Sequence, residues 1–160
     1  MEVSGDELAG VIDLFGALTP AELEQAIEEL AFKRGEDPPD VDSAVETALT
    51  SYRLVAIEPE SDSEPGDRLL LSGPTAFPVL PAGAEDLPHI LGIDTREIER
   101  ERLETSVEER FRAEAARAVL EGNEERVGEL LDASYDLEAW GKFDLEDIRA
   151  RLDAASATEE

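Results

Sequence analysis

The first part of the chain has apolar residues at helical spacing, which predicts two helices. In the first segment they fall at positions i, i+3, i+4 and i+7: Leu8, Val11, Ile12 and Phe15. Ser4 precedes this segment and Glu7 follows three residues later, which is the pattern of a capping box at a helix start. The second helix is predicted to begin after Thr19, with Pro20 in its first turn, and to end at Gly35.

A third helix is predicted after Asp40, followed directly by a β-hairpin. The apolar positions of this helix are Val41, Val45, Ala48, Leu49 and Tyr52. The short apolar segments 53–57 and 68–72 predict two strands, and the polar segment 58–67 predicts a long loop between them. We therefore expect residues 1–73 to form one unit with the order helix, helix, helix, strand, strand.

Residues 74–94 contain Pro74, Pro78, Pro81 and Pro88, and they predict an extended connector between two units. A short helical piece is expected near its end, at about residues 85–91. We expect three apolar side chains of the connector to lie on the core: Phe77, Val79 and Leu80.

Helical spacing returns in residues 95–155, which predict a second, helical unit. Its long first helix is expected to start at Thr95 and to stop at Gly122-Asn123, where a second helix begins antiparallel to the first. A short last helix follows, and residues 156–160 are expected to fray. The predicted fold class is therefore mainly α with a small β-hairpin, an α+β protein.

Charge limits what can be inferred about partners. The chain has 41 acidic and 14 basic residues, which gives a net charge of −27. The excess is spread along the whole chain, with 18 acids and 4 bases in residues 1–80 and 23 acids and 10 bases in residues 81–160. This composition resembles that of proteins from salt-loving archaea, whose molar internal salt screens such repulsion to within about 3 Å. A nucleic-acid mimic or a binder of basic proteins is the rival interpretation. Only the local placement of bases can therefore argue for a particular partner.

Two resemblances follow from these features. The order and lengths of the elements over residues 1–73 resemble those of the winged-helix domain. The whole sequence also resembles an uncharacterised family of small acidic haloarchaeal proteins. The second resemblance implies a haloarchaeal protein and assigns it no activity. We expect the protein to be cytoplasmic.

The winged-helix resemblance implies that the third helix would enter the major groove of DNA. Its outward positions are Asp42, Ser43, Glu46, Thr47, Thr50 and Ser51, none of which is cationic. Phosphate binding requires Lys or Arg, and the first half of the chain offers Lys33, Arg34, Arg53 and Arg68. If these four bases converge on one face, they would bind DNA together with Ser43 and Thr47. If they form separate ion pairs, the DNA-binding interpretation fails.

Enzymatic chemistry has little support in the sequence. His89 is the single histidine and lies among apolar residues, where a structural role is the expected one. The chain has no cysteine and no nucleotide-binding or nucleophile motif. We therefore expect no catalytic residue, no cofactor and no bound metal. No apolar segment is long enough to predict a membrane span.

Three of the eight aromatic residues lie close together near the C-terminus and suggest a partner-binding surface. The candidate residues are Tyr135, Leu137, Trp140 and Phe143. They form either an exposed patch for a protein partner or a plug that closes the core of the helical unit. If the apolar face of the long helix is larger than the small unit can cover, it would form a dimer seam. The residues in this seam would be Phe111, Ala115, Ala118 and Val119.

The function expected from the sequence is a non-enzymatic module for protein–protein interaction or assembly, with an unknown protein partner or a second copy of itself. The alternative is a transcription regulator that binds DNA. An enzyme is the third interpretation, and it would require a deep pocket that contains His89.

Overall fold

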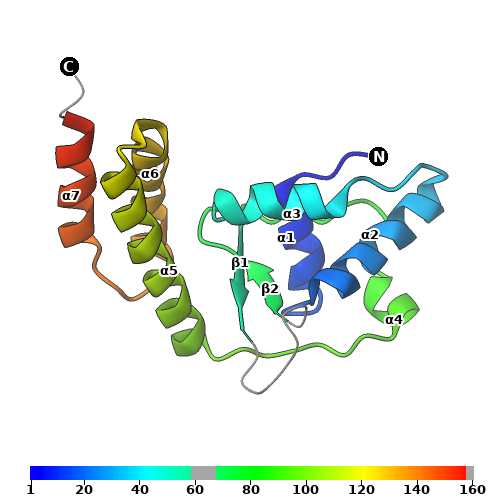
Figure 1. Cartoon of the computed structure of the whole chain (residues 1–160). Helices are drawn as coiled ribbons and strands as arrows, with labels where there is room; N and C mark the ends of the chain where they lie inside the picture. The colour runs from blue at the N-terminus through cyan, green and yellow to red at the C-terminus, as the bar shows by residue number, and fades with distance from the viewer. Residues whose placement is uncertain (59–67, 158–160) are drawn as a thin grey trace. The chain divides into compact units, whose positions relative to one another are not determined.

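The computed structural model describes residues 1–58 and 68–157, and the chain forms two compact units, Met1–Ile98 and Glu99–Glu160 (Figure 1). The fold class is the predicted one, because helices dominate and the strands form a two-stranded antiparallel sheet. Most of the predicted hairpin loop 58–67 and the end of the predicted frayed tail 156–160 lie outside the described residues.

Three helices of the first unit begin where local capping signals predict them: α1 (Gly5–Asp13), α2 (Pro20–Arg34) and α3 (Val41–Thr50). The hydroxyl of Ser4 accepts a hydrogen bond from Glu7 N, and Ser4 N donates to the Glu7 carboxylate, both at 3.1 Å. Thr19 and Glu22 form the same reciprocal box. These bonds satisfy backbone groups that a helix start leaves unpaired.

The end of α3 differs from the prediction, because Tyr52 lies beyond the helix with a φ of 62°. Tyr52 N donates to Leu49 O and Arg53 N donates to Ala48 O, which closes the helix in a Schellman arrangement. Glycine usually occupies this left-handed position, so a tyrosine there is strained. Its side chain is 1% exposed, and this burial offsets the strain.

The hairpin consists of β1 (Leu54–Ile57) and β2 (Leu69–Ser72), with Leu54 opposite Ser72. Leu18, between α1 and α2, forms an additional bridge to Leu70 through hydrogen bonds of 3.2 and 2.7 Å. The sheet therefore fastens the turn between the first two helices. The core that these elements share is built mainly from aliphatic residues, among them Leu8, Val11, Ile12, Leu23, Ile27, Leu30, Val45, Leu49, Leu54 and Leu70.

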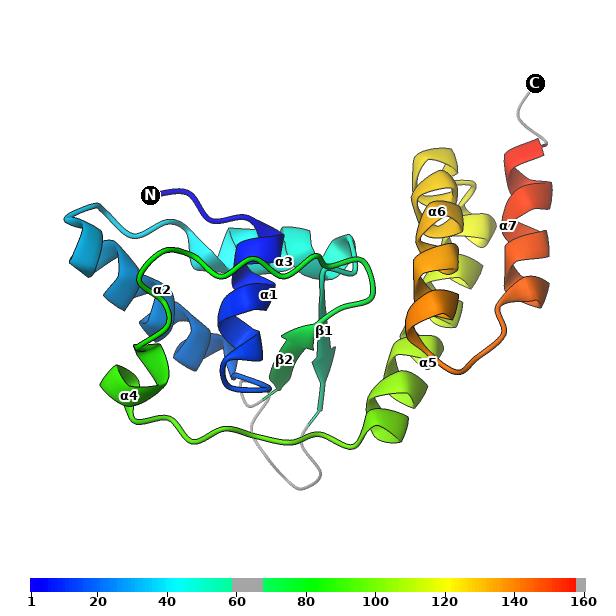
Figure 2. The ribbon, with the colours of Figure 1, turned by 180° about the vertical axis from the view of Figure 1, so that it is seen from behind.

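The predicted connector 74–94 belongs to the first unit, because the division between units falls after Ile98. Figure 2 shows this segment running past α1 to α4 (Leu87–Leu91). Its backbone holds it there: Val79 N donates to Asp6 O at 2.9 Å, and Phe77 N donates to the Asp6 carboxylate at 3.1 Å. A Cβ at Gly10 would lie 2.1 Å from Val79 O, so only glycine permits this close approach.

The expectation that the apolar side chains of this segment lie on the core is wrong. The exposed fraction is 81% for Phe77, 51% for Val79 and 41% for Leu80. The physical reason is that the backbone, and not the side chains, attaches the segment to α1. Later residues of the segment do enter the core, namely Ala84 and Leu87.

The last part of the first unit is tied to the start of α2 by Arg96. Its guanidinium donates to both carboxylate oxygens of Glu22, at 2.6 and 3.0 Å, and to Ala17 O at 3.1 Å. Its backbone N–H donates to Phe15 O at 2.7 Å. The pKa of Glu22 is lowered, chiefly by the hydrogen bonds from Arg96. Glu22 therefore serves the helix cap and this tertiary tie together.

The helical unit contains α5 (Arg100–Glu121), α6 (Glu124–Trp140) and α7 (Glu146–Ala157). The long helix begins at Arg100 and not at Thr95 as predicted. The reason is tertiary, because the bonds of Arg96 to Phe15 and Glu22 keep the preceding residues out of the helix. The break between α5 and α6 falls at Gly122-Asn123, as the sequence predicts.

We expect Glu22→Gln to lower the free energy of unfolding of the first unit by about 1–2 kcal/mol at neutral pH, the range for a partly exposed, charge-assisted hydrogen bond. Glutamine still completes the capping box, so the loss reports the tie to Arg96. Chemical denaturation of the variant and of wild type measures it. Glu24→Gln, an exposed neighbour on α2, is the matched control.

The loss should depend on pH in a defined direction. The folded pKa of Glu22 lies below its ordinary value of 4.5, so its contribution is complete above that value. The contribution disappears as the pH falls through the lowered folded pKa. Wild type and Glu22→Gln should therefore converge in stability in acid. A difference that persists unchanged in acid would contradict the role given to this carboxylate.

Candidate functional site

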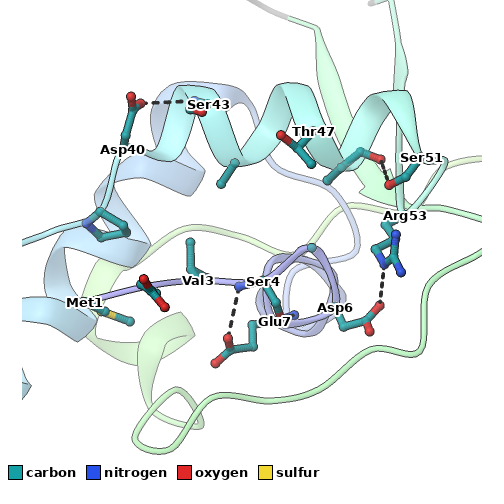
Figure 3. A pocket seen from close by; sticks show the side chains of 15 residues that line it. Met1, Val3, Ser4, Asp6, Glu7, Asp40, Ser43, Thr47, Ser51 and Arg53 are labelled. Carbon is teal, nitrogen blue, oxygen red and sulfur yellow. Dashed lines mark hydrogen bonds and ion pairs between the residues drawn. The ribbon is translucent and has the colours of Figure 1, made fainter.

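A groove of about 900 Å³ lies in the first unit, between α3 and the N-terminal segment Met1–Glu7 (Figure 3). One wall is the exposed side of α3, and the other is the extended N-terminal segment with the first turn of α1. The lining residues from α3 and its flanks are Pro39, Asp40, Ser43, Ala44, Thr47, Ala48, Ser51 and Arg53. The groove therefore lies on the face of the helix that the winged-helix resemblance would place against DNA.

A row of hydroxyl groups follows the α3 wall. Ser43, Thr47 and Ser51 are spaced by four residues, so successive hydroxyls lie about 6 Å apart along the helix axis. The hydroxyl of Ser51 donates to Ala48 O at 3.2 Å. The side chains of Ser43 and Thr47 are exposed and form no hydrogen bond within the described part of the chain. Two hydroxyls in this row are therefore available to an occupant.

Carboxylates form the rim of the groove. Asp40 accepts from Ser43 N at 3.1 Å and caps α3, and Glu7 completes the capping box of α1. Glu2 is exposed on the N-terminal segment. Asp6 has the most partners, because its Oδ1 atom accepts from Phe77 N and lies 3.5 Å from Arg53 Nε.

The floor of the groove is apolar. Met1, Val3 and Ala44 are half-buried against the hydrophobic core, and Ala48 is buried. The groove thus combines an apolar floor, a hydroxyl-bearing wall and an acidic rim.

The six residues predicted for nucleic-acid contact do not share one surface. Ser43, Thr47 and Arg53 line the groove, but Lys33, Arg34 and Arg68 do not. The head groups of Lys33 and Arg34 approach the carbonyls of Gly83 and Ala82, at 3.5 and 3.0 Å.

The remaining two bases of the first half have acidic partners. Arg53 pairs with Asp6 at 3.5 Å, and Arg68 lies 3.9 Å from the carboxylate of Glu46. The four bases are therefore divided between two backbone contacts and two ion pairs. The convergence that the DNA-binding interpretation requires is absent from the described residues.

The predicted aromatic surface divides into separate environments. Leu137 is fully buried in the helical unit, so it belongs to the core. Tyr135 is 58% exposed, and the guanidinium of Arg149 lies 4.3 Å from its ring centroid. Trp140 is half-buried, with the Arg100 guanidinium 4.0 Å from its ring and Phe143 at 6.5 Å. Intramolecular cations thus already occupy positions beside Tyr135 and Trp140.

The face of α5 considered as a dimer seam is largely covered. Phe111, Ala115 and Ala118 are at most 3% exposed within the helical unit, and Val119 is half-buried. The prediction of a seam there is wrong for the three buried residues, because α6 and α7 pack against this face. The exposed apolar residue at this end of α5 is Leu120.

Other predicted features lie outside the groove. His89 is exposed on α4 and does not line the groove.

The described residues contain no group of three or more side chains that could hold a metal ion. Among the same residues, no helix combines the length and the apolar character needed to cross a membrane.

Sequence reasoning identified α3 as a surface element but missed the opposite wall of the groove. The alternation of Met1, Glu2 and Val3 places two apolar side chains on one side of the segment and an acid on the other, but it does not indicate what the apolar side contacts. The contact of this segment with α3 is tertiary and has no local signature.

The comparisons with known proteins identify a family without an assigned function. A family model described as "Family of unknown function (DUF7109)" matches residues 6–157. The chain belongs to this family. The comparison with curated proteins gives no match, and the comparison with solved structures gives none either.

Trp140 is the only tryptophan, so its fluorescence reports this part of the helical unit directly. We expect Arg100→Ala to move its emission to longer wavelength, because the ring loses the guanidinium above it and gains contact with water. Stability of the unit should fall by about 1 kcal/mol, as for an exposed cation–π contact. The matched control is Arg117→Ala, an exposed site on the same helix, and an equal spectral shift in it would contradict the assignment.

Proposed function

We propose that this protein is a non-enzymatic module for protein–protein interaction or assembly in the cytoplasm of a halophilic archaeon. Its first unit would use a winged-helix-like scaffold to present α3 to a protein partner. The observation that supports this most is the groove beside α3, whose rim carries carboxylates and whose single basic side chain, Arg53, is paired with Asp6.

The electrostatics of α3 favour a protein partner over DNA. Binding to DNA derives much of its free energy from Lys and Arg side chains that neutralise phosphates. The exposed positions of α3 include Asp42 and Glu46, which repel phosphate. Arg68, at the base of the hairpin, lies near Glu46 and away from the groove lining. Screening by salt weakens this repulsion but creates no attraction.

The net charge of −27 supports the halophilic part of the proposal. Repulsion among so many carboxylates opposes folding at low ionic strength, and molar salt removes most of it. Ion pairs that survive molar salt must be short and partly desolvated, as the 2.6 Å contacts of Arg96 and Arg126 are. The acidic surface as a whole then maintains solubility.

A transcription regulator remains the second candidate, and one observation favours it. Ser43 and Thr47 present free hydroxyls on the helix that a winged-helix protein inserts into DNA, and such groups can hydrogen-bond base edges. Under this alternative the groove would face a nucleic acid, and binding would depend on cations supplied by another protein.

The proposed function predicts a stoichiometric protein partner that remains bound after nuclease treatment. The tagged protein would be isolated from a haloarchaeal lysate in molar KCl, with and without nuclease, and co-purifying species identified by mass spectrometry. A matched tag on an unrelated acidic protein controls for nonspecific capture. Recovery of the protein alone after nuclease, with DNA fragments in the untreated sample, would overturn the proposal in favour of the regulator.

The halophilic assignment predicts that thermal stability rises steeply with KCl between about 0.1 and 1 M, where the screening length falls from about 10 to 3 Å. Circular dichroism across this range would follow the melting temperature. Sucrose at matched osmolality is the control, because it favours compact states without screening charge. Equal stabilisation by sucrose, or no dependence on KCl, would contradict the assignment.

A further inference from the structure

We propose that the groove beside α3 binds an extended segment of a partner protein that has Lys or Arg at alternate positions. This inference rests on the proposed function and adds the site and the chemistry of the partner. It follows from the spacing of the hydroxyls on one wall, the composition of floor and rim, and the balance of charge in the groove.

The spacing of the hydroxyl row matches an extended chain. Ser43, Thr47 and Ser51 follow one another along α3 (Figure 3). Helix geometry spaces them by about 6 Å. An extended peptide repeats every second residue, about 6.6 Å, and presents backbone N–H and C=O groups along its length. A peptide parallel to α3 can therefore place successive backbone groups beside the hydroxyls of Ser43 and Thr47. A helical ligand would turn most of its backbone groups inward and leave these hydroxyls without backbone partners.

The floor and rim fit long cationic side chains. Lys and Arg have an aliphatic stem that packs on apolar surface and a charged head that needs polar contact. Val3, Ala44 and Ala48 provide the apolar floor for such stems, and Glu2, Asp6 and Asp40 lie within the rim for the heads. An aliphatic side chain would match the floor only, and a short acidic one would meet carboxylates.

The charge of the groove also selects against the other occupants. Its acidic side chains are Glu2, Asp6, Glu7 and Asp40, against Arg53 as the basic one. A nucleic acid would bring phosphates to this rim. A second copy of this chain would bring a surface with the same acidic excess. A partner segment with an excess of cations is the complementary occupant.

Molar salt makes the preference for a cationic segment more specific. At about 1 M the screening length is about 3 Å, so only charges in contact attract. General attraction between an acidic protein and a basic peptide is thereby removed. Binding that persists must come from direct ion pairs, hydrogen bonds to the hydroxyl row and burial of stems on the floor.

The test is a fluorescence anisotropy titration of the full chain in about 2 M KCl. The probe is a labelled decapeptide of alternating arginine and threonine, and its partner peptide has glutamine in place of arginine. We expect saturable one-to-one binding of the arginine peptide, weakened about tenfold or more in the glutamine peptide by loss of charge-assisted hydrogen bonds.

Two pairs of variants locate the binding. Thr47→Trp fills the groove and should abolish binding, whereas Gln25→Trp, at an exposed site on α2 outside the groove, should leave it unchanged. Glu2→Gln with Asp40→Asn removes two rim charges and should weaken binding about three- to tenfold. Asparagine still caps α3. Glu24→Gln with Glu28→Gln removes two exposed charges of α2 and is the matched control.

Three results would overturn the inference. They are absence of peptide binding by wild type, equal loss in the groove and α2 variants, and displacement of the peptide by duplex DNA but not by unlabelled peptide. Circular dichroism of Thr47→Trp verifies its fold. If it unfolds, the rim variant decides the outcome.

Failure of the inference is distinguishable from failure of the proposed function. Capture from lysate with Thr47→Trp and Gln25→Trp separates the two. If both variants retain the wild-type partner, the proposed function stands and the groove is not the site. If wild type retains no protein partner, the proposed function fails independently of the peptide result.

Discussion

Scarcity of positive charge is the constraint on which the structure depends. The chain has 14 basic and 41 acidic residues, so each arginine has many possible acidic partners. Several arginines form ion pairs that join segments distant in the sequence. In the first unit, Arg96 links the residues before α5 to the cap of α2, and Arg53 links the start of β1 to α1. In the helical unit, Arg126 joins α6 to α5 through Glu114 at 2.6 Å, and Arg112 joins α5 to α7 through Asp147 at 3.0 Å.

These ties have a consequence for the groove. An exposed arginine that pairs with a solvated carboxylate adds little stability, but a partly buried one with several acceptors fixes the position of a segment. Arg53 is of the first kind, because 45% of its side chain is exposed and its contact with Asp6 is 3.5 Å, but the same Asp6 carboxylate also accepts from Phe77 N. Asp6 therefore lines the groove and also attaches the segment that contains Phe77 to α1. Of the rim carboxylates, Asp6 pairs with Arg53, and Glu7 and Asp40 accept from backbone N–H groups.

The sequence predicts those parts of the structure whose signals are local. The starts of α1, α2 and α3 follow from Ser4, Thr19 and Asp40 because each cap acts within one helical turn. The start of α5 could not be predicted, since Arg96 is held by residues about eighty positions earlier. The exposure of Phe77 was missed for a similar reason: backbone contacts with Asp6 attach its segment and leave the side chain outside. Of the candidate site, the α3 wall was predictable and the N-terminal wall was not.

The central claim is that α3 presents its groove to a protein partner. Because the chain has no cysteine, a single one introduced as Thr47→Cys can carry a photoreactive crosslinker at one defined position. Irradiation in lysate at molar KCl, followed by mass spectrometry, identifies what lies within reach of the groove. We expect the crosslinker at position 47 to react with a Lys- or Arg-bearing segment of a partner protein. The control variant Gln25→Cys on α2 should give no such crosslink. Crosslinks to DNA from position 47, or equal crosslinks from both positions, would contradict the claim.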